Sequence, residues 1–276
     1  MDKNTISRDG THIAYERTGQ GPAVVLVSGA MSTGATMAPL AAHLSDRFDV
    51  IAYDRRGRGE SGDTAPYAVA REVEDLAALI DAAGGEASLY GISSGGALVL
   101  RAAASGLPVR RVAVYEVPFA VYEGGAAERA EYTERLDEAL GHGRRGDAVE
   151  LFLRLTGLAE EMIQGARHSP MWAGLEAIAP SLAYDNAVMG DGLVPSERLA
   201  SITVPVLSVA GGASPAWMRE AARAVAETAS QGTYRSLEGQ THTVDPSVLA
   251  PVLAEFFSSA AHPGQELRNP KPTGQK

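Results

Sequence analysis

The feature that most constrains the fold of this 276-residue chain is a regular alternation of short β-rich runs with Ala-rich stretches. Residues 23–27 and 48–53 are predicted to be buried strands, and residues 69–83 and 94–105 have the apolar spacing of helices. This order indicates an α/β fold, in which a mostly parallel central sheet carries helices on both faces. Further strands are predicted at 11–17, 87–90, 111–116, 204–210 and 233–237, and further helices at 36–44, 215–228 and 246–258.

The alternation stops near residue 119 and returns only near residue 204. Residues 119–195 contain no convincing strand, and helical spacing is found at 128–140 and 147–155. We therefore expect one core formed by residues 1–118 and 196–260, interrupted by a helical cap insertion at 119–195. The remaining tail, 261–276, is polar and contains Pro and Gly, so it is expected to be disordered.

Composition excludes several classes of function. The chain has 24 basic and 34 acidic residues, a net charge of −10, which repels nucleic acid and anionic membranes, so neither is an expected partner. It has no cysteine, which excludes thiol nucleophiles and zinc ribbons, and no pair of histidines has metal-ligand spacing on one helix. No cofactor or metal is therefore implied. The first ten residues contain no apolar stretch, and we expect a cytoplasmic protein.

The sequence GISSG at residues 91–95 has the pattern G-x-S-x-G. A predicted strand runs directly into it and a predicted helix leaves directly after it, which is the context of a nucleophile elbow. Such a turn exposes the hydroxyl of its serine, Ser93, and the helix N-terminus favours negative charge beside it. A glycine-rich turn or phosphate loop is the alternative. The glycines at 57, 59 and 62 also match a dinucleotide pattern, but the next helix starts too far away, which favours a structural turn.

With this elbow in place, the chain resembles α/β-hydrolase-fold proteins over about residues 4–260. DRRGRGES at 54–61, VSGA at 27–30 and EGQTH at 238–242 are similar to three of that family's loops, although Ser28 stands where the family often has a histidine. The resemblance implies that Ser93 is the nucleophile and His242 its base. It also implies that the backbone N–H groups of Ala30 and Ser94 form the oxyanion hole.

The acid that completes a catalytic triad is harder to place. In the family it most often follows the seventh strand, but residues 210–217 contain no carboxylate, and Ser214 stands about where the acid is expected. A variant of the family takes the acid from the end of the sixth strand, and Glu116 closes the apolar run there. A carboxylate in such a place is costly unless it is paired. We therefore predict Ser93–Glu116–His242, with a salt bridge from Glu116 to an arginine as the alternative.

The predicted cap insertion is rich in Met and aromatic residues, which suggest a mid-sized, largely apolar pocket or simply the core of the cap. Together these features predict a serine hydrolase that cleaves a small-molecule ester, lactone or thioester through an acyl-enzyme on Ser93. The alternatives are a C–C hydrolase, acyltransferase or cyclase of secondary metabolism on the same triad, or a non-catalytic ligand-binding protein. The predicted pocket residues are Phe119, Met162, Met171, Trp172 and Tyr184.

Overall fold

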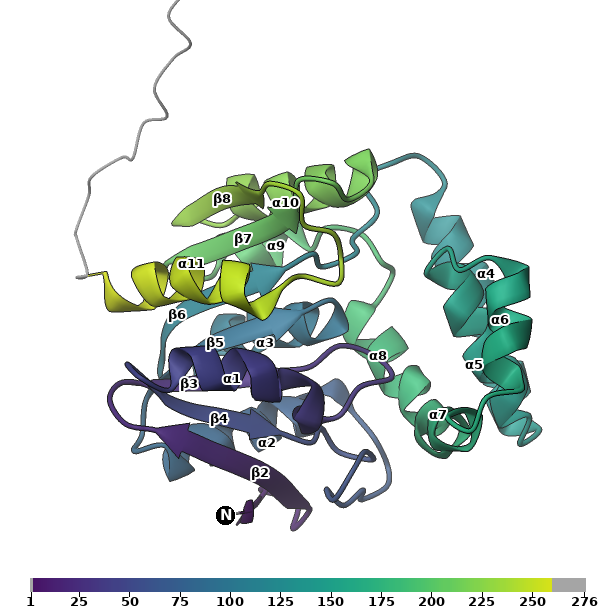
Figure 1. Ribbon diagram of the computed structural model, residues 1–276, viewed down its shortest axis with the longest axis horizontal. Coiled ribbons are helices and arrows are strands. Elements are labelled where there is room, and N and C mark those ends of the chain that lie inside the picture. The colour runs from purple at the N-terminus through teal and green to yellow at the C-terminus, as the bar shows by residue number, and fades with distance from the viewer. Residues whose placement is uncertain (1, 260–276) are drawn as a thin grey trace, which may run out of the picture.

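A computed structural model describes residues 2–259, so the tail predicted at 261–276 lies outside the described residues (Figure 1). Within these residues the chain forms one eight-stranded sheet with the order β1-β2-β4-β3-β5-β6-β7-β8. The pairs of β1 with β2 and β2 with β4 are antiparallel, and all other pairs are parallel. The strands are β1 (Asp2–Ile6), β2 (His12–Gly19), β3 (Ala23–Val27), β4 (Asp49–Tyr53), β5 (Ala87–Ile92), β6 (Val109–Tyr115), β7 (Val206–Gly211) and β8 (Gly232–Leu237).

Helices cover both faces of this sheet, which confirms the predicted fold class (Figure 1). One face packs against α1 and α11, and the other against α2, α3 and α10. The short helices η1 and α9 lie in the connections around them. The bounds are η1 (Gly34–Met37), α1 (Ala38–Leu44), α2 (Val69–Ala82), α3 (Ser94–Ala104), α9 (Ser196–Ala200), α10 (Ala216–Thr228) and α11 (Pro246–Ser258).

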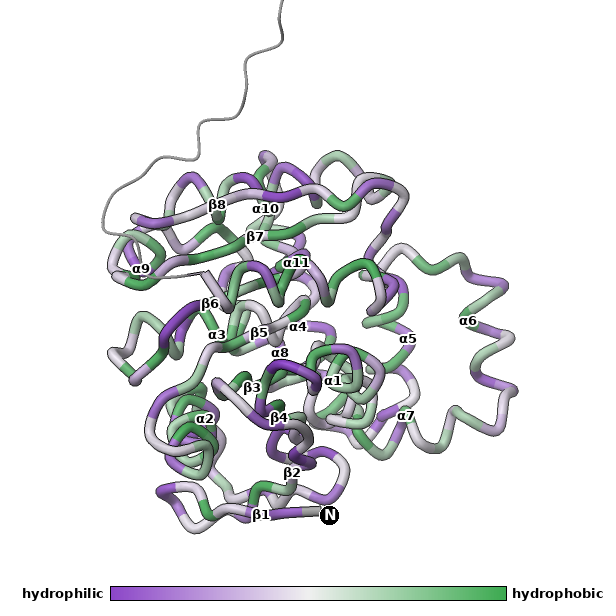
Figure 2. The backbone as a smooth tube through the Cα atoms, turned by 60° about the vertical axis from the view of Figure 1, so that its left-hand side comes forward, coloured by the Kyte–Doolittle hydropathy of each residue, from purple (hydrophilic) through white to green (hydrophobic). Residues whose placement is uncertain are grey.

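Strand β3 shows how the sequence produces this three-layer core. All five of its residues are buried, and successive side chains of a strand point to opposite faces. Val25 and Val27 therefore pack into the core under α2 and α3, whereas Val24 and Leu26 pack under α1 and α11. Figure 2 shows the same apolar character along β7, while β8 at the sheet edge is paler. Continuous apolar runs are thus explained by burial on both faces.

The inserted segment between β6 and β7 contains helices and no named strand among its residues, all of which are described. Its helices α4 to α7 stand at one side of the sheet, and α8 runs between them and the core (Figure 1). None of the helices within residues 2–259 combines the length and apolar character needed to cross a membrane. The inserted elements are α4 (Gly125–Gly141), α5 (Arg145–Leu155), α6 (Glu160–Arg167), α7 (Trp172–Ile178), η2 (Ala179–Ser181) and α8 (Leu182–Met189).

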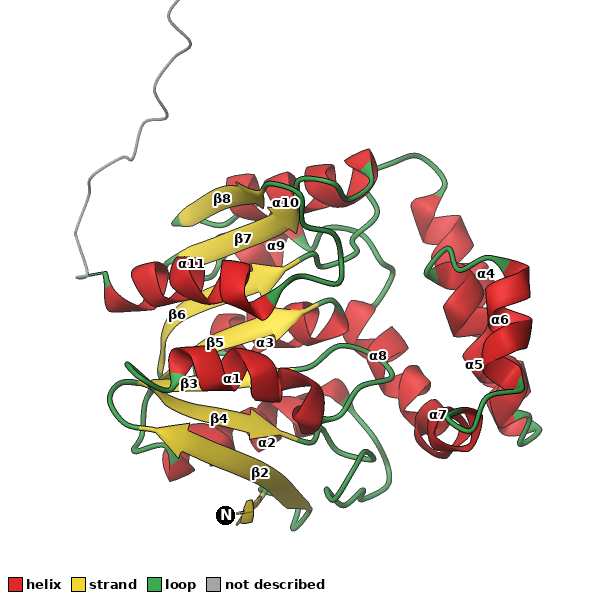
Figure 3. Cartoon of the chain, in the orientation of Figure 1, coloured by secondary structure: helices red, strands yellow, loops and turns green. Residues whose placement is uncertain are grey.

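Strand β1 was not predicted from the sequence. Its residues DKNTI are mostly polar and lack the apolar alternation of a half-buried strand. It forms because the backbone of β1 pairs with β2 at the sheet edge, with Ile6 opposite His12. The parallel strands all end on the side of the sheet that faces α8, and Figure 3 shows the loops that follow them gathered there. Ligands of such sheets bind beyond these carboxyl ends.

Candidate active site

Ser93 lies in the sharp turn between β5 and α3, with φ +55° and ψ −127°. The turn requires the small residues that the sequence places on either side of it. A Cβ atom on Gly91 would lie 2.4 Å from the carbonyl oxygen of Gly95, and a Cβ atom on Gly95 would lie 2.5 Å from that of Ser28. The half-buried Ser93 is held in register because its N–H donates to the Tyr115 carbonyl at 3.0 Å.

Glu116 follows β6 directly and is fully buried. Its Oε1 accepts a hydrogen bond from the backbone N–H of Gly211 at 2.7 Å, and its Oε2 lies 2.9 Å from Nδ1 of His242. Both carboxylate oxygens are therefore paired, and among the described residues no arginine forms a salt bridge with Glu116. The structure thus joins the predicted acid to the predicted base rather than to a cation.

Two opposing effects act on the pKa of Glu116. Burial raises the pKa, because the charged form loses its hydration. The hydrogen bonds from His242 and Gly211, together with the neighbouring Ser214 hydroxyl, lower it by more, so the pKa lies below the ordinary value of a glutamate. The buried Oγ of Ser214 forms no hydrogen bond of full geometry among the described residues, so it acts as a nearby dipole. At neutral pH Glu116 is therefore ionised and accepts hydrogen bonds only.

Ser214 stands about where the resemblance to α/β-hydrolases led us to expect the acid, and in this structure it is buried beside the Glu116 carboxylate. The carboxylate beside His242 is therefore supplied from the end of β6, by Glu116, and not from the end of β7. Strand pairing makes this possible, because the Glu116 N–H donates to Val209 of β7 at 3.0 Å. One carboxylate at this position is enough, since a second would repel the first.

His242 lies in the loop between β8 and α11, and 47% of its side chain is exposed. The hydroxyl of Tyr115 donates to the carbonyl of Thr241 at 2.6 Å, which ties this loop to the end of β6. Among the described residues, none forms a hydrogen bond with the Ser93 hydroxyl. Bonds between nucleophile and base are often long without substrate and shorten in the reacting complex.

The loop after β3 lies against the elbow. A Cβ atom on Gly29 would be 3.1 Å from Cβ and 3.7 Å from Oγ of Ser93. The next residue, Ala30, and the first residue of α3, Ser94, have backbone N–H groups without a hydrogen-bond partner in the described part of the chain. Two free donors beside a serine hydroxyl are what an oxyanion hole needs.

Backbone strain marks the same place. Within residues 2–259 the non-glycine residues with positive φ are Met31, Ser93 and Glu116, at +55°, +55° and +46°. One follows Ala30, one is the elbow serine and one is the buried carboxylate. Such conformations cost about 1–3 kcal/mol each and are retained where the surroundings hold the chain.

The predicted pocket residues have different surroundings. Met162 and Met171 are 61% and 74% exposed, so neither fits the lining of an enclosed apolar pocket. Both belong to the inserted segment, where too few apolar neighbours surround them. Phe119 is buried in the core cluster on the α2 and α3 side of the sheet. Trp172 is buried with Val149 and Ala179 in a cluster that also includes Met31.

The side chain of Tyr184 packs against the loop after β4 instead of lining a pocket. Its ring stacks on Tyr67, with centroids 3.8 Å apart, and its hydroxyl donates to Asp63 at 2.6 Å. The same loop contains the glycines that match a dinucleotide pattern. A Cβ atom on Gly59 would lie 2.0 Å from the carboxylate of Asp54, so the loop closes on that side chain as a structural turn.

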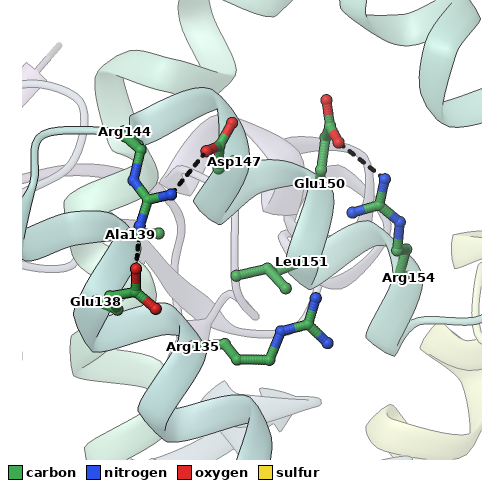
Figure 4. Close-up of a pocket in the computed structure, with 8 residues that line it drawn as sticks. All are labelled: Arg135, Glu138, Ala139, Arg144, Asp147, Glu150, Leu151 and Arg154. Atoms are coloured by element: carbon green, nitrogen blue, oxygen red, sulfur yellow. Dashed lines mark hydrogen bonds and ion pairs between the residues drawn. The ribbon is translucent and has the colours of Figure 1, made fainter.

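Two surface hollows lie away from these residues. One of about 220 Å³ lies between α4 and α5, and Figure 4 shows its charged lining. Arg144 pairs there with Glu138 at 2.7 Å, and Arg154 with Glu150 at 2.8 Å, so these charges are already neutralised. A second hollow, of about 280 Å³, includes residues of β2 and α1. No predicted site residue lines either one, and within residues 2–259 no three His, Asp or Glu side chains are grouped to hold a metal ion.

One buried residue near the elbow was missed by sequence reasoning. Asp185 of α8 accepts a hydrogen bond from the Ser94 hydroxyl at 2.7 Å and pairs with Arg55 and Arg58. Burial raises its pKa, but the two arginines lower it by more, so it is held below its ordinary value. A signal was available, because an aspartate within the apolar run 182–189 demands a partner when buried.

Known proteins resemble this chain over most of its length. A model of the alpha/beta hydrolase family matches residues 24–252. The 2-(acetamidomethylene)succinate hydrolase of Mesorhizobium japonicum is 32% identical over 206 residues, 71% of this chain and 72% of that protein. The putative carbamate hydrolase RutD of Azorhizobium caulinodans is 30% identical over 207 residues, 71% of this chain and 75% of that protein. A solved alpha/beta hydrolase from Sphaerobacter thermophilus is 53% identical, with TM-score 0.85, covering 93% of this chain and 100% of its own.

Proposed function

This chain belongs to the alpha/beta hydrolase family, and from that membership we propose that it is a serine hydrolase with Ser93 as nucleophile. Its substrate is a carboxylic ester, lactone or thioester, which it cleaves through an acyl-enzyme. The observation that carries the proposal is the contact between the buried Glu116 and His242, at 2.9 Å. Glu116 directly follows Tyr115, whose carbonyl accepts a hydrogen bond from the N–H of Ser93 in its strained elbow. A carboxylate that orients an imidazole next to a serine is the arrangement of a catalytic triad.

The roles of the two ring nitrogens of His242 follow from its partner. Because the pKa of Glu116 is lowered, its carboxylate is ionised and accepts a hydrogen bond from Nδ1–H. Nε2 is then the ring nitrogen that offers an electron pair. This is the tautomer in which Nε2 can remove the proton of the Ser93 hydroxyl.

The reaction proceeds in two halves. Ser93 Oγ attacks the carbonyl carbon while His242 takes its proton, and the negative oxygen is stabilised by the N–H groups of Ala30 and Ser94. His242 then returns the proton to the leaving group, which departs as the alcohol or thiol and leaves the acyl group on Ser93. A water molecule, deprotonated by His242, attacks that ester. The Ser93–acyl bond then breaks, His242 returns the proton to Ser93 Oγ, and the acid is released.

The expected partner is a small molecule with a largely apolar acyl group, and the expected compartment is the cytoplasm. The net charge of −10 favours neither nucleic acid nor anionic membranes as partners. The same residues also suit a second candidate, hydrolysis of an amide or carbamate. That candidate is favoured by the names of the relatives, one a putative carbamate hydrolase and one acting on a compound with an acetamido group.

A fluorophosphonate probe tests the nucleophile directly. We expect stoichiometric labelling of Ser93, no label on Ser93→Ala, and a loss of hydrolysis of about 10³-fold or more in that variant. Ser105→Ala, at the far end of the same helix, is the matched control and should retain labelling and activity. Absence of label on folded wild-type protein, together with no turnover of nitrophenyl esters, thioesters, lactones, carbamates or amides, would favour a ligand-binding protein instead.

A further inference from the structure

A buried cluster joins the inserted segment to both residues that supply the free N–H groups. We define the Asp185 cluster as Asp185 on α8, Arg55 and Arg58 in the loop after β4, and Ser94 at the start of α3. Arg55 and Arg58 are buried as completely as the apolar core. The catalytic steps described above use none of these four side chains.

The carboxylate of Asp185 is the centre of this cluster. Its Oδ1 accepts from Nη1 of Arg55 and from the Ser94 hydroxyl, each at 2.7 Å, and its Oδ2 accepts from Nη2 of Arg58 at 2.7 Å. Charge-assisted bonds of this length are strong and fix the geometry of both partners. Arg55 is also neutralised by Glu72, at 2.7 and 2.8 Å.

Arg58 connects Asp185 to the loop after β3. While Nη2 of Arg58 binds Asp185, its Nη1 donates to the Gly29 carbonyl at 2.7 Å. The C=O of Gly29 and the N–H of Ala30 belong to the same planar peptide unit. That unit is trans, since the one cis peptide bond among the described residues precedes Pro66. With its oxygen held by Arg58, the peptide must direct the Ala30 N–H to the opposite side.

Ser94 provides the second connection. Its hydroxyl is bonded to Asp185, and its N–H is the other free donor at the elbow. One carboxylate therefore restrains Ser94 through its own side chain and Ala30 through Arg58 and Gly29. We propose that Asp185 is a positioning residue that aligns both oxyanion donors, and this inference rests on the proposed function.

The position of Asp185 in the chain adds a consequence. It belongs to α8 of the inserted segment, whereas Ala30 and Ser94 belong to the core. Displacement of α8 removes the carboxylate from both donors at once, so a well-formed oxyanion hole requires that helix in place. Positioning of donors affects the transition state more than substrate binding, and kcat should fall while KM changes little.

The chain offers a matched control in the neighbouring arginine of the same loop. Arg56 is also fully buried and pairs with Asp75 on α2 at 2.6 and 2.8 Å, but this pair contacts neither Ser94 nor the loop after β3. Asp185→Asn and Asp75→Asn are therefore the same substitution in the same kind of buried arginine pair. Only one of them changes the proposed oxyanion hole.

The experiment compares kcat, KM and the rate of fluorophosphonate labelling for the wild type, Asp185→Asn, Asp75→Asn and Ser94→Ala. We expect kcat to fall about 10- to 100-fold in Asp185→Asn, somewhat below the loss of a whole donor, with KM within about 3-fold. In Ser94→Ala, kcat should fall about 3- to 10-fold, because one of two restraints on the donors is removed. Asp75→Asn should stay within about 2-fold, and the pH profile should be unchanged in all variants, since His242 and Glu116 are untouched.

Two results would overturn the inference. The first requires an active wild type: either folded Asp185→Asn keeps the wild-type kcat, or Asp75→Asn loses as much kcat as Asp185→Asn does. If Asp185→Asn does not fold, Ser94→Ala decides, because it keeps the backbone N–H and removes a single oxygen. The second overturning result is a wild-type kcat in Ser94→Ala. Failure of the proposed function is distinguishable, because it would leave the wild type itself unlabelled and inactive.

Discussion

Two regions differ in how they place charge. One is the carboxyl-end edge of the sheet, where the loops after the parallel strands gather, and the other is the inserted helices α4–α7. At the sheet edge Glu116, Arg55 and Arg58 are buried, each with defined partners from distant parts of the chain. In the inserted helices most charged pairs are exposed and formed between near neighbours, such as Arg144 with Glu138, and Glu150 is the buried exception. Buried pairs fix geometry, whereas exposed pairs are weak and screened by salt.

This difference separates the part of the molecule that carries the proposed catalytic residues from the inserted helices. The strained residues Met31, Ser93 and Glu116 all lie at the carboxyl-end edge of the sheet, and none lies in the inserted helices α4–α7. Among the described contacts, Asp185 is the buried charge of the insertion that reaches the elbow. We therefore expect substitutions at the edge to abolish activity and most substitutions in α4–α7 to affect it little.

The largest effect that tests this comparison is expected from Glu116→Gln. An amide cannot hold Nδ1 of His242 as a charged acceptor, so the imidazole loses its orientation and the stabilisation of its protonated form. We expect kcat to fall about 10²- to 10⁴-fold. The measurement is steady-state hydrolysis of a nitrophenyl ester, with circular dichroism to establish folding.

Glu150→Gln is the control for that variant in the inserted helices. Glu150 is also a nearly buried glutamate, and it pairs with Arg154 at 2.8 Å and with Arg167. We expect its kcat to remain within about 2-fold of the wild type, since Glu150 bonds to Arg154 and Arg167 and to none of Ser93, His242 or Glu116 among the described contacts. Equal losses of kcat in Glu116→Gln and Glu150→Gln would contradict the view that activity depends on the carboxyl-end edge of the sheet more than on the inserted helices.

A smaller but substantial effect is expected on stability from Glu72→Gln. Glu72 is buried and holds Arg55 through two bonds, so the substitution leaves a buried cation incompletely neutralised. The free energy of unfolding should fall by about 3–5 kcal/mol at pH 7. Urea denaturation followed by circular dichroism measures it, and a loss below about 1 kcal/mol would contradict the view that edge pairs differ from surface pairs.

The pH dependence sharpens the same test. Burial raises the pKa of Glu72, but Arg55 and Arg58 lower it by more, so it lies below its ordinary value. The stabilisation from this carboxylate is therefore fully present above the ordinary glutamate pKa of about 4.3 and is lost as pH falls through the lower folded value. We expect the difference in unfolding free energy between wild type and Glu72→Gln to shrink below about pH 4. A difference that is constant from pH 7 to pH 3 would exclude this origin.

The smallest effect is expected from Arg144→Gln in the inserted helices. Arg144 is exposed and pairs with Glu138 at 2.7 Å and with Asp147 at 3.6 Å (Figure 4). Unfolding free energy should change by about 1 kcal/mol or less, and that change should disappear in about 1 M salt. Activity should not change. A loss as large as that of Glu72→Gln would show that the two regions do not differ.

Much of the core was predictable because its signals are local. Strand β3 and helix α11 have the predicted bounds, since each is a short apolar run ended by turn or capping residues. The elbow around Ser93 was predictable for the same reason, as its two glycines are required within five residues. The contact of Glu116 with His242 was anticipated from the resemblance to a family variant whose acid follows the sixth strand, and from the cost of a buried carboxylate.

The rest depended on contacts between distant segments. The polar strand β1 exists because β2 offers an unpaired edge, which its own residues do not reveal. Met162 and Met171 have the composition of a pocket lining, but exposure is decided by what packs over them. Asp185 lies 91 residues from Ser94 in the sequence, and no spacing rule connects the two.

The sequence by itself determined the order of the apolar strands and of the helices that cover them, the strained serine turn and the presence of one acid and one base at strand ends. Those properties follow from backbone sterics and from the burial of apolar runs, which act over a few residues. Only the tertiary structure decided that Glu116 at the end of β6 lies beside Ser214 and that Asp185 of α8 bonds to Ser94 and, through Arg58, to Gly29 next to Ala30. Buried charges require partners in space, and the chain fold alone determines which distant residues are near enough to pair.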